Sequence, residues 1–165
     1  MTQPSSETAT ESVLSTISRE MVKLFKEQFG RGPVKSRAYW AGPDVIVCVL
    51  EETLTKAEQN LVALGEHQLL RETRLVFQAA TVPEFCAPVE RATGRKVRAF
   101  MSAVDTAVDG ISFETFVLHP EGYDGPGRAE IGAQVGEIGP QGRGPGDAST
   151  ATGPKSGEAA VIDHG

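Results

Sequence analysis

The chain has 165 residues, a net charge of −6 and a pI of about 5.1. This acidic balance argues against binding nucleic acid through its phosphates, and the longest apolar run, Val45–Leu50, is far shorter than the ~20 residues that span a bilayer. All seven Phe and the single Trp lie between Phe25 and Phe116, whereas 12 of the 18 Gly follow Leu118. We therefore expect one folded domain over residues 12–118, no nucleic-acid partner and no direct membrane insertion.

The N-terminal residues 1–11 are polar and lack the basic and apolar stretches of a signal peptide, so we expect them to be disordered and the protein to be cytoplasmic. Across residues 13–29 the apolar side chains recur three and four positions apart, which predicts a helix with one buried face. Ser12 is a suitable N-cap, and Gly30 is a suitable left-handed residue to end the helix. The Gly32-Pro33 pair then turns the chain out of the helical path.

Two strands are predicted next, on either side of the turn "AGPD". In residues 34–40 small or apolar residues alternate with Lys, Arg and Tyr, which is typical of a half-buried strand. Residues 45–50 are apolar on both faces of the strand. We therefore expect this second strand at the centre of the sheet, or with a partner covering its second face.

The segment "TLTKAEQNL" predicts the start of a helix, because Thr55 followed three residues later by Glu58 forms a capping box. A second helical run starts near Glu66, and its apolar residues are expected to face inward. These residues are Leu69, Leu70, Val76, Phe77 and Ala80. Because proline lacks a backbone N–H, a break is expected near residues 81–83, and Gly94 is placed to close the run that follows.

Residues 97–105 and 111–118 predict a second hairpin, around "TAVDG". The segments "GRGPVKSRA" and "GRKVRA" each follow a predicted helix end and open a strand, which is a faint internal echo. We therefore predict an α+β fold in which two α-β-β units form one four-stranded antiparallel sheet with helices packed on one face. Residues 119–165 are rich in Gly and Pro, carry 7 acidic and 3 basic side chains, and predict a disordered acidic tail.

The sequence shows no motif for catalysis or metal binding. Cys48 and Cys86 stand in apolar surroundings without a C-x-x-C spacing, and the three His have no metal-ligand spacing. We expect two buried free thiols, no metal and no cofactor. A G-x-S-x-G elbow is also missing, so we expect no catalytic residue and no enzyme. Catalytic groups that meet only in the fold would need a pocket with perturbed titratable side chains.

Arg31, between Gly30 and Gly32-Pro33, is the first candidate binding residue. A guanidinium between glycines suits a carboxylate, phosphate or bicarbonate, which it can hold by two parallel hydrogen bonds. Alternatively, the glycines turn the chain and Arg31 covers the helix end. Arg37 and Arg95 could join Arg31 in an anion-binding patch, although interleaved glutamates favour a solvated surface of mixed charge.

The order of several blocks in this chain is similar to that of one known family. The blocks are "GRGP", "DVIVCVLEETLTKAEQNL", the glycine at position 65, "RETRLVF", "ATGRKVRAFMS" and "FETFVL". Together they resemble the small bacterial MpsC family, a component of a Na⁺-translocating system that generates membrane potential and supports bicarbonate uptake. The resemblance covers about residues 13–118 and implies a soluble accessory protein associated with membrane transport proteins. By analogy it points to Gly30, Arg31, Gly32, Pro33, Leu54, Thr55 and Glu58.

Two functions from different classes follow from these observations. The first is a non-enzymatic accessory or regulatory domain that forms homo-oligomers and docks on another protein, such as a membrane transport protein. The second is a sensor of a small anion, bicarbonate or a phosphorylated metabolite, that uses Arg31 and its basic neighbours. Thr55, Glu58 and Gly94 are expected to have structural roles in either case.

Overall fold

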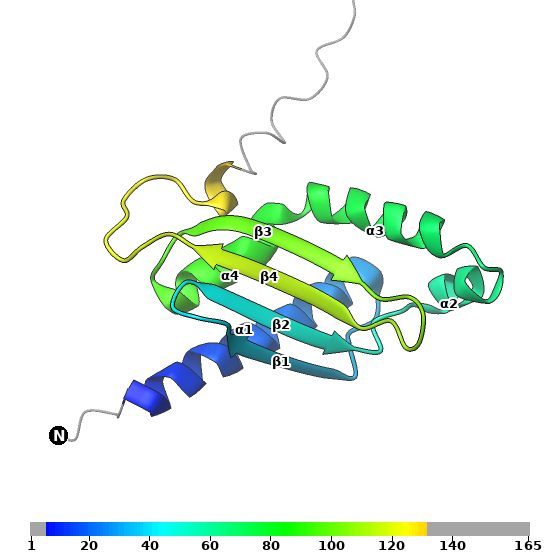
Figure 1. Ribbon diagram of the computed structural model, residues 1–165, viewed down its shortest axis with the longest axis horizontal. Coiled ribbons are helices and arrows are strands. Elements are labelled where there is room, and N and C mark those ends of the chain that lie inside the picture. Colours follow the sequence, from blue (N-terminus) through cyan, green and yellow to red (C-terminus); the bar gives the residue numbers. More distant parts are fainter. Residues whose placement is uncertain (1–5, 132–165) are drawn as a thin grey trace, which may run out of the picture.

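The computed structural model describes residues 6–131 and contains helices and strands in the order expected for two α-β-β units (Figure 1). The elements are α1 (Ser6–Phe29), β1 (Lys35–Trp40), β2 (Val45–Glu51), α2 (Lys56–Ala63), α3 (His67–Ala80), α4 (Val82–Thr93), β3 (Val97–Val104) and β4 (Ser112–Leu118). A short helical turn at residues 128–131 follows β4. Among the described residues, no helix is long and apolar enough to cross a membrane.

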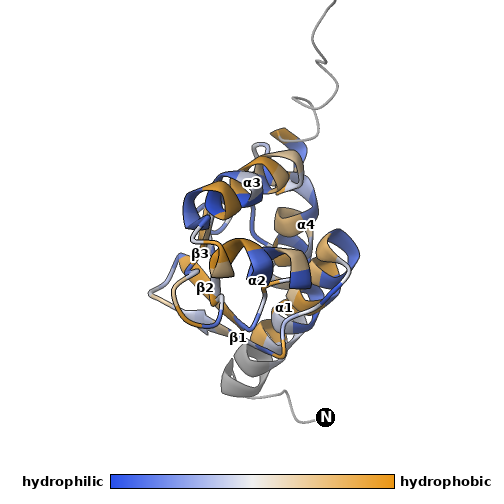
Figure 2. Ribbon diagram, turned by 90° about the vertical axis from the view of Figure 1, so that its right-hand side faces the viewer, coloured by the Kyte–Doolittle hydropathy of each residue, from blue (hydrophilic) through white to orange (hydrophobic). Residues whose placement is uncertain are grey.

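The strands form one sheet in the order β1-β2-β4-β3, and every neighbouring pair is antiparallel. The two hairpins are joined through their second strands, β2 and β4, so the order α1-β1-β2 is repeated by α4-β3-β4. Figure 2 shows the sheet end-on, with α1 and α4 on the same side of it. The predicted α+β fold, with two α-β-β units in one four-stranded antiparallel sheet and helices on one face, is confirmed.

The core lies between this face of the sheet and the helices. Ile17, Met21 and Phe25 are four residues apart in α1, so they share one face of the helix and are fully or almost fully buried. Alternate residues of the strands meet them from the sheet. The buried apolar residues of the strands are Ile46, Cys48, Leu50, Val97, Phe100, Phe116 and Leu118, and those of α4 are Val82, Phe85, Cys86 and Val89.

Equivalent glycines end the helices of the two units. Gly30 follows α1 with a φ of +72°, and Gly94 follows α4 with a φ of +66°, the left-handed conformation that glycine adopts without steric cost. The break between α3 and α4 falls at Thr81, and Pro83 lies in the first turn of α4, where its missing N–H leaves no helical hydrogen bond unmade. Both features agree with the sequence predictions.

The ends of the domain differ from the prediction. Helix α1 begins at Ser6 rather than after Ser12, because the segment "SETATE" has few helix breakers and continues the same helix. Residues 119–131, predicted to be part of a disordered tail, pack on the domain: the His119 backbone N–H donates to the Lys96 carbonyl, and Ala129 packs against the core. The rest of the predicted tail, residues 132–165, lies outside the described residues, as do residues 1–5.

The inward face of α3 was predicted correctly for Leu70 but wrongly for the other apolar residues. Its buried residues are Leu70 and Arg74, whereas Leu69, Val76 and Phe77 are about half exposed or more. The cause is Arg74, which turns inward to pair with a carboxylate of α2 and so sets the rotation of the whole helix. As a result α3 places few apolar side chains into the core beneath it.

Candidate functional site

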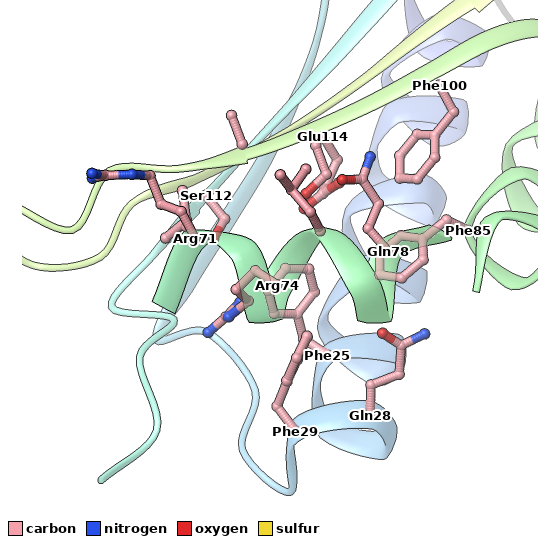
Figure 3. Close-up of a pocket in the computed structure, with 14 residues that line it drawn as sticks. Phe25, Gln28, Phe29, Arg71, Arg74, Gln78, Phe85, Phe100, Ser112 and Glu114 are labelled. Atoms are coloured by element: carbon pink, nitrogen blue, oxygen red, sulfur yellow. The ribbon is translucent and has the colours of Figure 1, made fainter. Parts of the chain in front are cut away.

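A cavity of about 220 Å³ lies between α3 and the sheet (Figure 3). Its lining combines phenylalanine rings with polar side chains. Phe25, Phe85 and Phe100 line it from three different elements, and the Phe85 and Phe100 rings stack with their centroids 5.4 Å apart. Because α3 places Arg74 at the cavity, where a large apolar side chain would fill the space, the space under the helix is incompletely filled. The cavity therefore follows from the rotation of α3.

Glu114 of β4 is the most unusual group in this cavity. Its residue is 1% exposed, and its Oε1 atom accepts a hydrogen bond of 2.9 Å from the Ser102 hydroxyl. Its Oε2 atom has no hydrogen-bond partner among the described residues. Burial raises the pKa of Glu114 to about 8, and the Ser102 hydrogen bond and the charge of Arg74 offset this only in part. This raised pKa favours the neutral carboxylic acid at pH 7, with the proton on the oxygen that lacks a partner.

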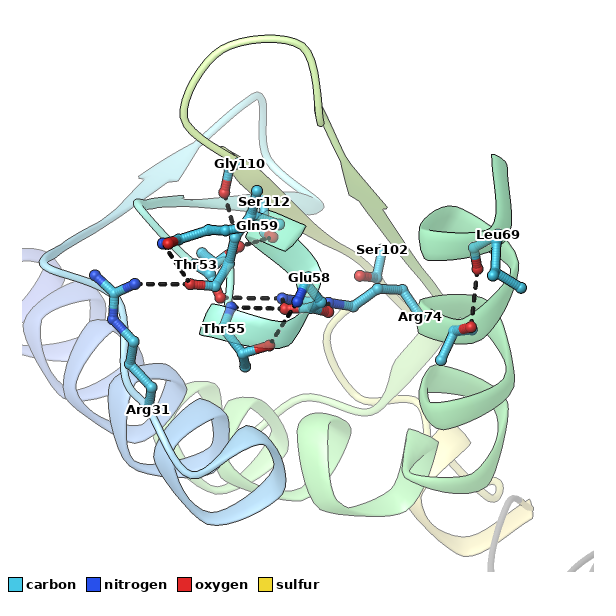
Figure 4. A network of polar contacts seen from close by, with 12 residues as sticks. Arg31, Thr53, Thr55, Glu58, Gln59, Leu69, Arg74, Ser102, Gly110 and Ser112 are labelled. Atoms are coloured by element: carbon cyan, nitrogen blue, oxygen red, sulfur yellow. Dashed lines mark hydrogen bonds and ion pairs between the residues drawn. The ribbon is translucent and has the colours of Figure 1, made fainter. Parts of the chain in front are cut away.

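Arg74 forms a buried ion pair at the edge of the cavity (Figure 4). Its Nε donates to Glu58 Oε1 at 2.5 Å, and its Nη2 donates to Glu58 Oε2 at 2.7 Å and to the Thr53 carbonyl at 3.0 Å. The guanidinium also lies 4.2 Å from the centroid of the Phe29 ring. Arg74 is therefore already matched by a carboxylate, and its charge does not ionise Glu114.

Glu58 joins this ion pair to the capping box predicted from sequence. Its Oε2 accepts from the Thr55 backbone N–H at 2.7 Å, and the Thr55 hydroxyl accepts from the Glu58 backbone N–H at 3.3 Å. Burial raises the pKa of Glu58, but hydrogen bonds from Arg74 and Thr55 outweigh it and lower the pKa overall. Thr55 and Glu58 thus have structural roles that fix α2 against α3.

The Gly-Arg-Gly-Pro segment lies outside the cavity. Arg31 Nη1 donates to the Leu54 carbonyl at 2.7 Å, and its Nη2 lies 3.8 Å from a Glu52 carboxylate oxygen. A Cβ at Gly32 would lie 3.3 Å from the Val22 carbonyl oxygen, so this glycine lets the chain pass close to α1. Pro33 is buried. In the structure this segment turns the chain and ties it to the loop before α2.

The predicted basic residues do not share one site. Arg37 projects from β1 with its guanidinium 3.8 Å from Glu51. Arg95 follows α4, where its Nη1 donates to the Pro43 carbonyl at 2.9 Å, and this turn lies at the opposite end of the sheet from Arg31. Arg31, Arg37 and Arg95 therefore have three separate surroundings, and none of them lines the cavity.

Sequence reasoning missed Glu114, although a signal was present. In "SFETFVL" the residues Ser112, Glu114, Phe116 and Leu118 alternate onto one face of the strand, and the last two must face the core. A carboxyl group on the same face must then be buried. What the sequence could not show is the space that α3 leaves above it.

The second face of the sheet, here called the open sheet face, is turned toward the viewer in Figure 1 and carries no described helix. The strand registers place these residues on it: Lys35, Arg37, Tyr39, Val45, Val47, Val49, Glu51, Ala99, Met101, Ala103, Phe113, Thr115 and Val117. Tyr39 is 45% exposed, Met101 59% and Phe113 41%. The doubly apolar strand β2 is therefore central, as predicted, and no helix within residues 6–131 covers its second face.

The cysteines and the other titratable groups give no further site in the described residues. Cys48 and Cys86 are both buried and free, and burial raises the pKa of each thiol to about 12. Within residues 6–131, no three His, Cys, Asp or Glu side chains come together in a way that could hold a metal ion. Among the described residues, the cavity and the open sheet face are the two features considered further as binding sites.

Fold and site together define a small α+β domain with one sheet face that carries no described helix and a buried carboxyl group at a cavity lined in part by phenylalanines. The family model described as "Na+-translocating membrane potential-generating system (MpsC)" matches residues 9–119, from near the start of α1 to the residue after β4. The chain belongs to the MpsC family, and this membership associates it with a Na⁺-translocating system. No curated protein and no solved structure matches the chain.

Proposed function

We propose that the protein is a non-enzymatic, cytoplasmic accessory component of a Na⁺-translocating membrane system that also supports bicarbonate transport, and that it acts through protein–protein contacts. Family membership supplies the link to the membrane system. The proposal is non-enzymatic because the perturbed carboxyl of Glu114 has Ser102 as its hydrogen-bond partner, and a hydroxyl together with one neutral acid does not make an activated nucleophile.

The open sheet face is the observation that carries the proposal. An antiparallel sheet that faces water normally presents polar residues there, whereas this face presents valines at three positions of β2 flanked by Tyr39, Met101 and Phe113. A contiguous apolar surface of this kind marks an interaction site. Its rim carries both charge signs, from Arg37 and Glu51, so the face can meet a copy of itself without like-charge repulsion dominating.

We assign a second copy of the chain as the occupant of the open sheet face. With strands ~4.8 Å apart and a rise of ~3.3 Å per residue, four strands cover a footprint of roughly 20 by 20 Å, and side-chain relief adds to this area. Two such faces bury on the order of 1,000 Å², the lower bound for a stable interface. The result is a two-sheet sandwich that leaves the helices outward, free to contact the membrane system.

Sedimentation equilibrium on the full chain tests this assignment. Met101→Glu and Phe113→Glu each place a charge in the interface, and both are expected to convert the dimer to a monomer without a change in far-UV circular dichroism. Val108→Glu is the matched control, because Val108 is 87% exposed at the tip of the β3–β4 loop, outside the open sheet face. A wild-type monomer at every concentration overturns the homodimer.

Recovery from host membranes tests the accessory role. Tagged wild type is expected to copurify with subunits of a membrane transport system, and a tagged protein that recovers none contradicts the role. If wild type is monomeric and the two face variants alone lose a transport subunit, the occupant of the face is that subunit rather than a second copy. The separate surroundings of Arg31, Arg37 and Arg95 favour docking on a protein over sensing of a small anion. The anion sensor stays a prediction, and titration of wild type and Arg31→Ala with bicarbonate and phosphate tests it.

A further inference from the structure

We propose that the cavity between α3 and the sheet binds a small, largely apolar molecule that carries one neutral carbonyl, as in a ketone, ester or amide, and that this carbonyl accepts a hydrogen bond from the Glu114 carboxyl group. The site is distinct from the open sheet face, because Glu114 lies on the helix-covered face of β4.

The size and lining of the cavity set the apolar part of the ligand. The volume of about 220 Å³ exceeds that of an engineered apolar cavity of ~150 Å³ that holds benzene, so one aromatic ring with a short substituent fits. Phe25, Phe29, Phe85 and Phe100 present rings to this space (Figure 3). Such rings favour a flat apolar ligand, which can stack on a face or meet an edge.

The Glu114 carboxyl group determines which polar group the ligand carries. Its Oε1 atom already accepts from Ser102, so the proton of the neutral acid belongs on Oε2, the atom without a described partner. Buried donors that lack a partner are rare, since leaving one unmatched costs roughly 1–3 kcal/mol. Oε2 has less than 1 Å² of accessible surface, so a ligand carbonyl reaches and satisfies this donor only when the side chains around it shift.

The charged groups around Glu114 favour a neutral ligand. From α3 the cavity is lined by Arg71, whose Nη1 donates to the Thr106 hydroxyl, and by Arg74, which is paired with Glu58. From β2 the residue opposite Glu114 is Cys48, a neutral thiol whose pKa burial raises to about 12. A cationic ligand would meet two arginines, and an anion would lose its hydration against phenylalanine rings.

One helix forms the outer wall of the cavity. Arg71, Arg74, Leu75 and Gln78 line it from α3, and their spacing of three and four residues is one face of that helix. The opposite face of α3 is exposed, with Val76 69% accessible. The cavity is already partly open to solvent, since Leu75 in its lining is 56% exposed, and this opening gives a ligand a route in.

Binding of three probes of matched shape to the full chain tests the proposal: acetophenone with a carbonyl, ethylbenzene without one, and 1-phenylethylamine with a cation. Titrations followed by ligand-observed NMR at pH 6.5 are expected to show acetophenone bound about fivefold to tenfold more tightly than ethylbenzene, the value of one hydrogen bond. Acetophenone binding is expected to weaken about fourfold to fivefold by pH 9, because Glu114 loses its proton and only the apolar part of the binding remains.

Two variants separate the hydrogen bond from the shape of the cavity. Glu114→Gln keeps a donor that does not titrate, so acetophenone binding is expected to persist and to lose its dependence on pH. Glu114→Leu is expected to bind acetophenone and ethylbenzene equally. Three results would overturn the proposal: no binding of any probe to wild type, equal binding of acetophenone and ethylbenzene to wild type at pH 6.5, or tighter binding of the amine than of acetophenone.

Discussion

Ionisation of Glu114 is expected to destabilise the fold as the pH rises. Burial raises the pKa of this carboxyl from its ordinary 4.5 to about 8. Because the folded state then holds the proton more tightly than the unfolded state, the stabilisation is fully present below about pH 4.5 and is lost as the pH rises through about 8. At about 1.4 kcal/mol per pH unit, the loss amounts to roughly 5 kcal/mol over the whole range.

Glu114→Gln removes this titration while keeping the size of the side chain. The free energy of unfolding of the variant, minus that of wild type, is expected to grow by roughly 3 kcal/mol between pH 6 and pH 9. Urea unfolding of the full chain, followed by circular dichroism at several pH values, measures this difference. Glu72→Gln on the exposed side of α3 is the control and should run parallel to wild type. If Glu114→Gln also runs parallel to wild type, the carboxyl is not held neutral by burial and the reasoning fails.

Three further predictions concern backbone, ion pair and thiols. Gly110 has a φ of +71°, and a Cβ added there would lie 2.2 Å from a carbon of Leu54, so Gly110→Ala is expected to lose about 3 kcal/mol of stability. Gly94→Ala, whose Cβ meets nothing within 4 Å, is expected to lose about 1 kcal/mol. Equal losses for the two variants in urea unfolding would contradict this. Arg74→Ala leaves the part-buried Glu58 carboxylate without its partner and is expected to lower the free energy of unfolding by about 3 kcal/mol or more in the same assay. A loss below about 1 kcal/mol would argue that water already reaches the ion pair. Cys48 and Cys86 are expected to resist an aromatic disulfide reagent at pH 8 until urea unfolds the chain, and fast labelling of the native protein would show that one thiol is accessible.

Local patterns in the sequence predicted the helices, hairpins and caps because each depends on residues close together in the chain. The three-and-four spacing in α1, the alternation in the strands and the Thr55–Glu58 capping box are of this kind, and the structure confirms all of them. The pairing of two α-β-β units was also predicted, since each helix ends at a glycine, Gly30 or Gly94, immediately before a hairpin.

The cavity could not be predicted, because it depends on a contact between residues of different helices. Sequence reasoning turned Leu69, Val76 and Phe77 inward, whereas the pairing of Arg74 with Glu58 rotates α3 so that these residues face out. A buried ion pair thus overrides the apolar periodicity of the helix, and no pattern within α3 alone reveals its partner. The sequence pattern singled out Arg31, which does not line the cavity. Its partners lie in the loop before α2, and that contact cannot be read from the residues next to it in the chain.

The order of the strands constrains how the chain can fold. β4 is the last strand in the sequence but lies in the middle of the sheet, where it pairs with both β2 and β3. The pairing of β2 with β4, in which Val45 lies opposite Val117, can therefore form only after the last strand is available. Until β4 is made, the β1-β2 hairpin exposes an inner edge that can pair with another chain, and contacts of such long range slow folding. Before β4 has been synthesised the sheet lacks one of its two central strands, and in this state the unpaired edge of β2 can aggregate or bind a chaperone.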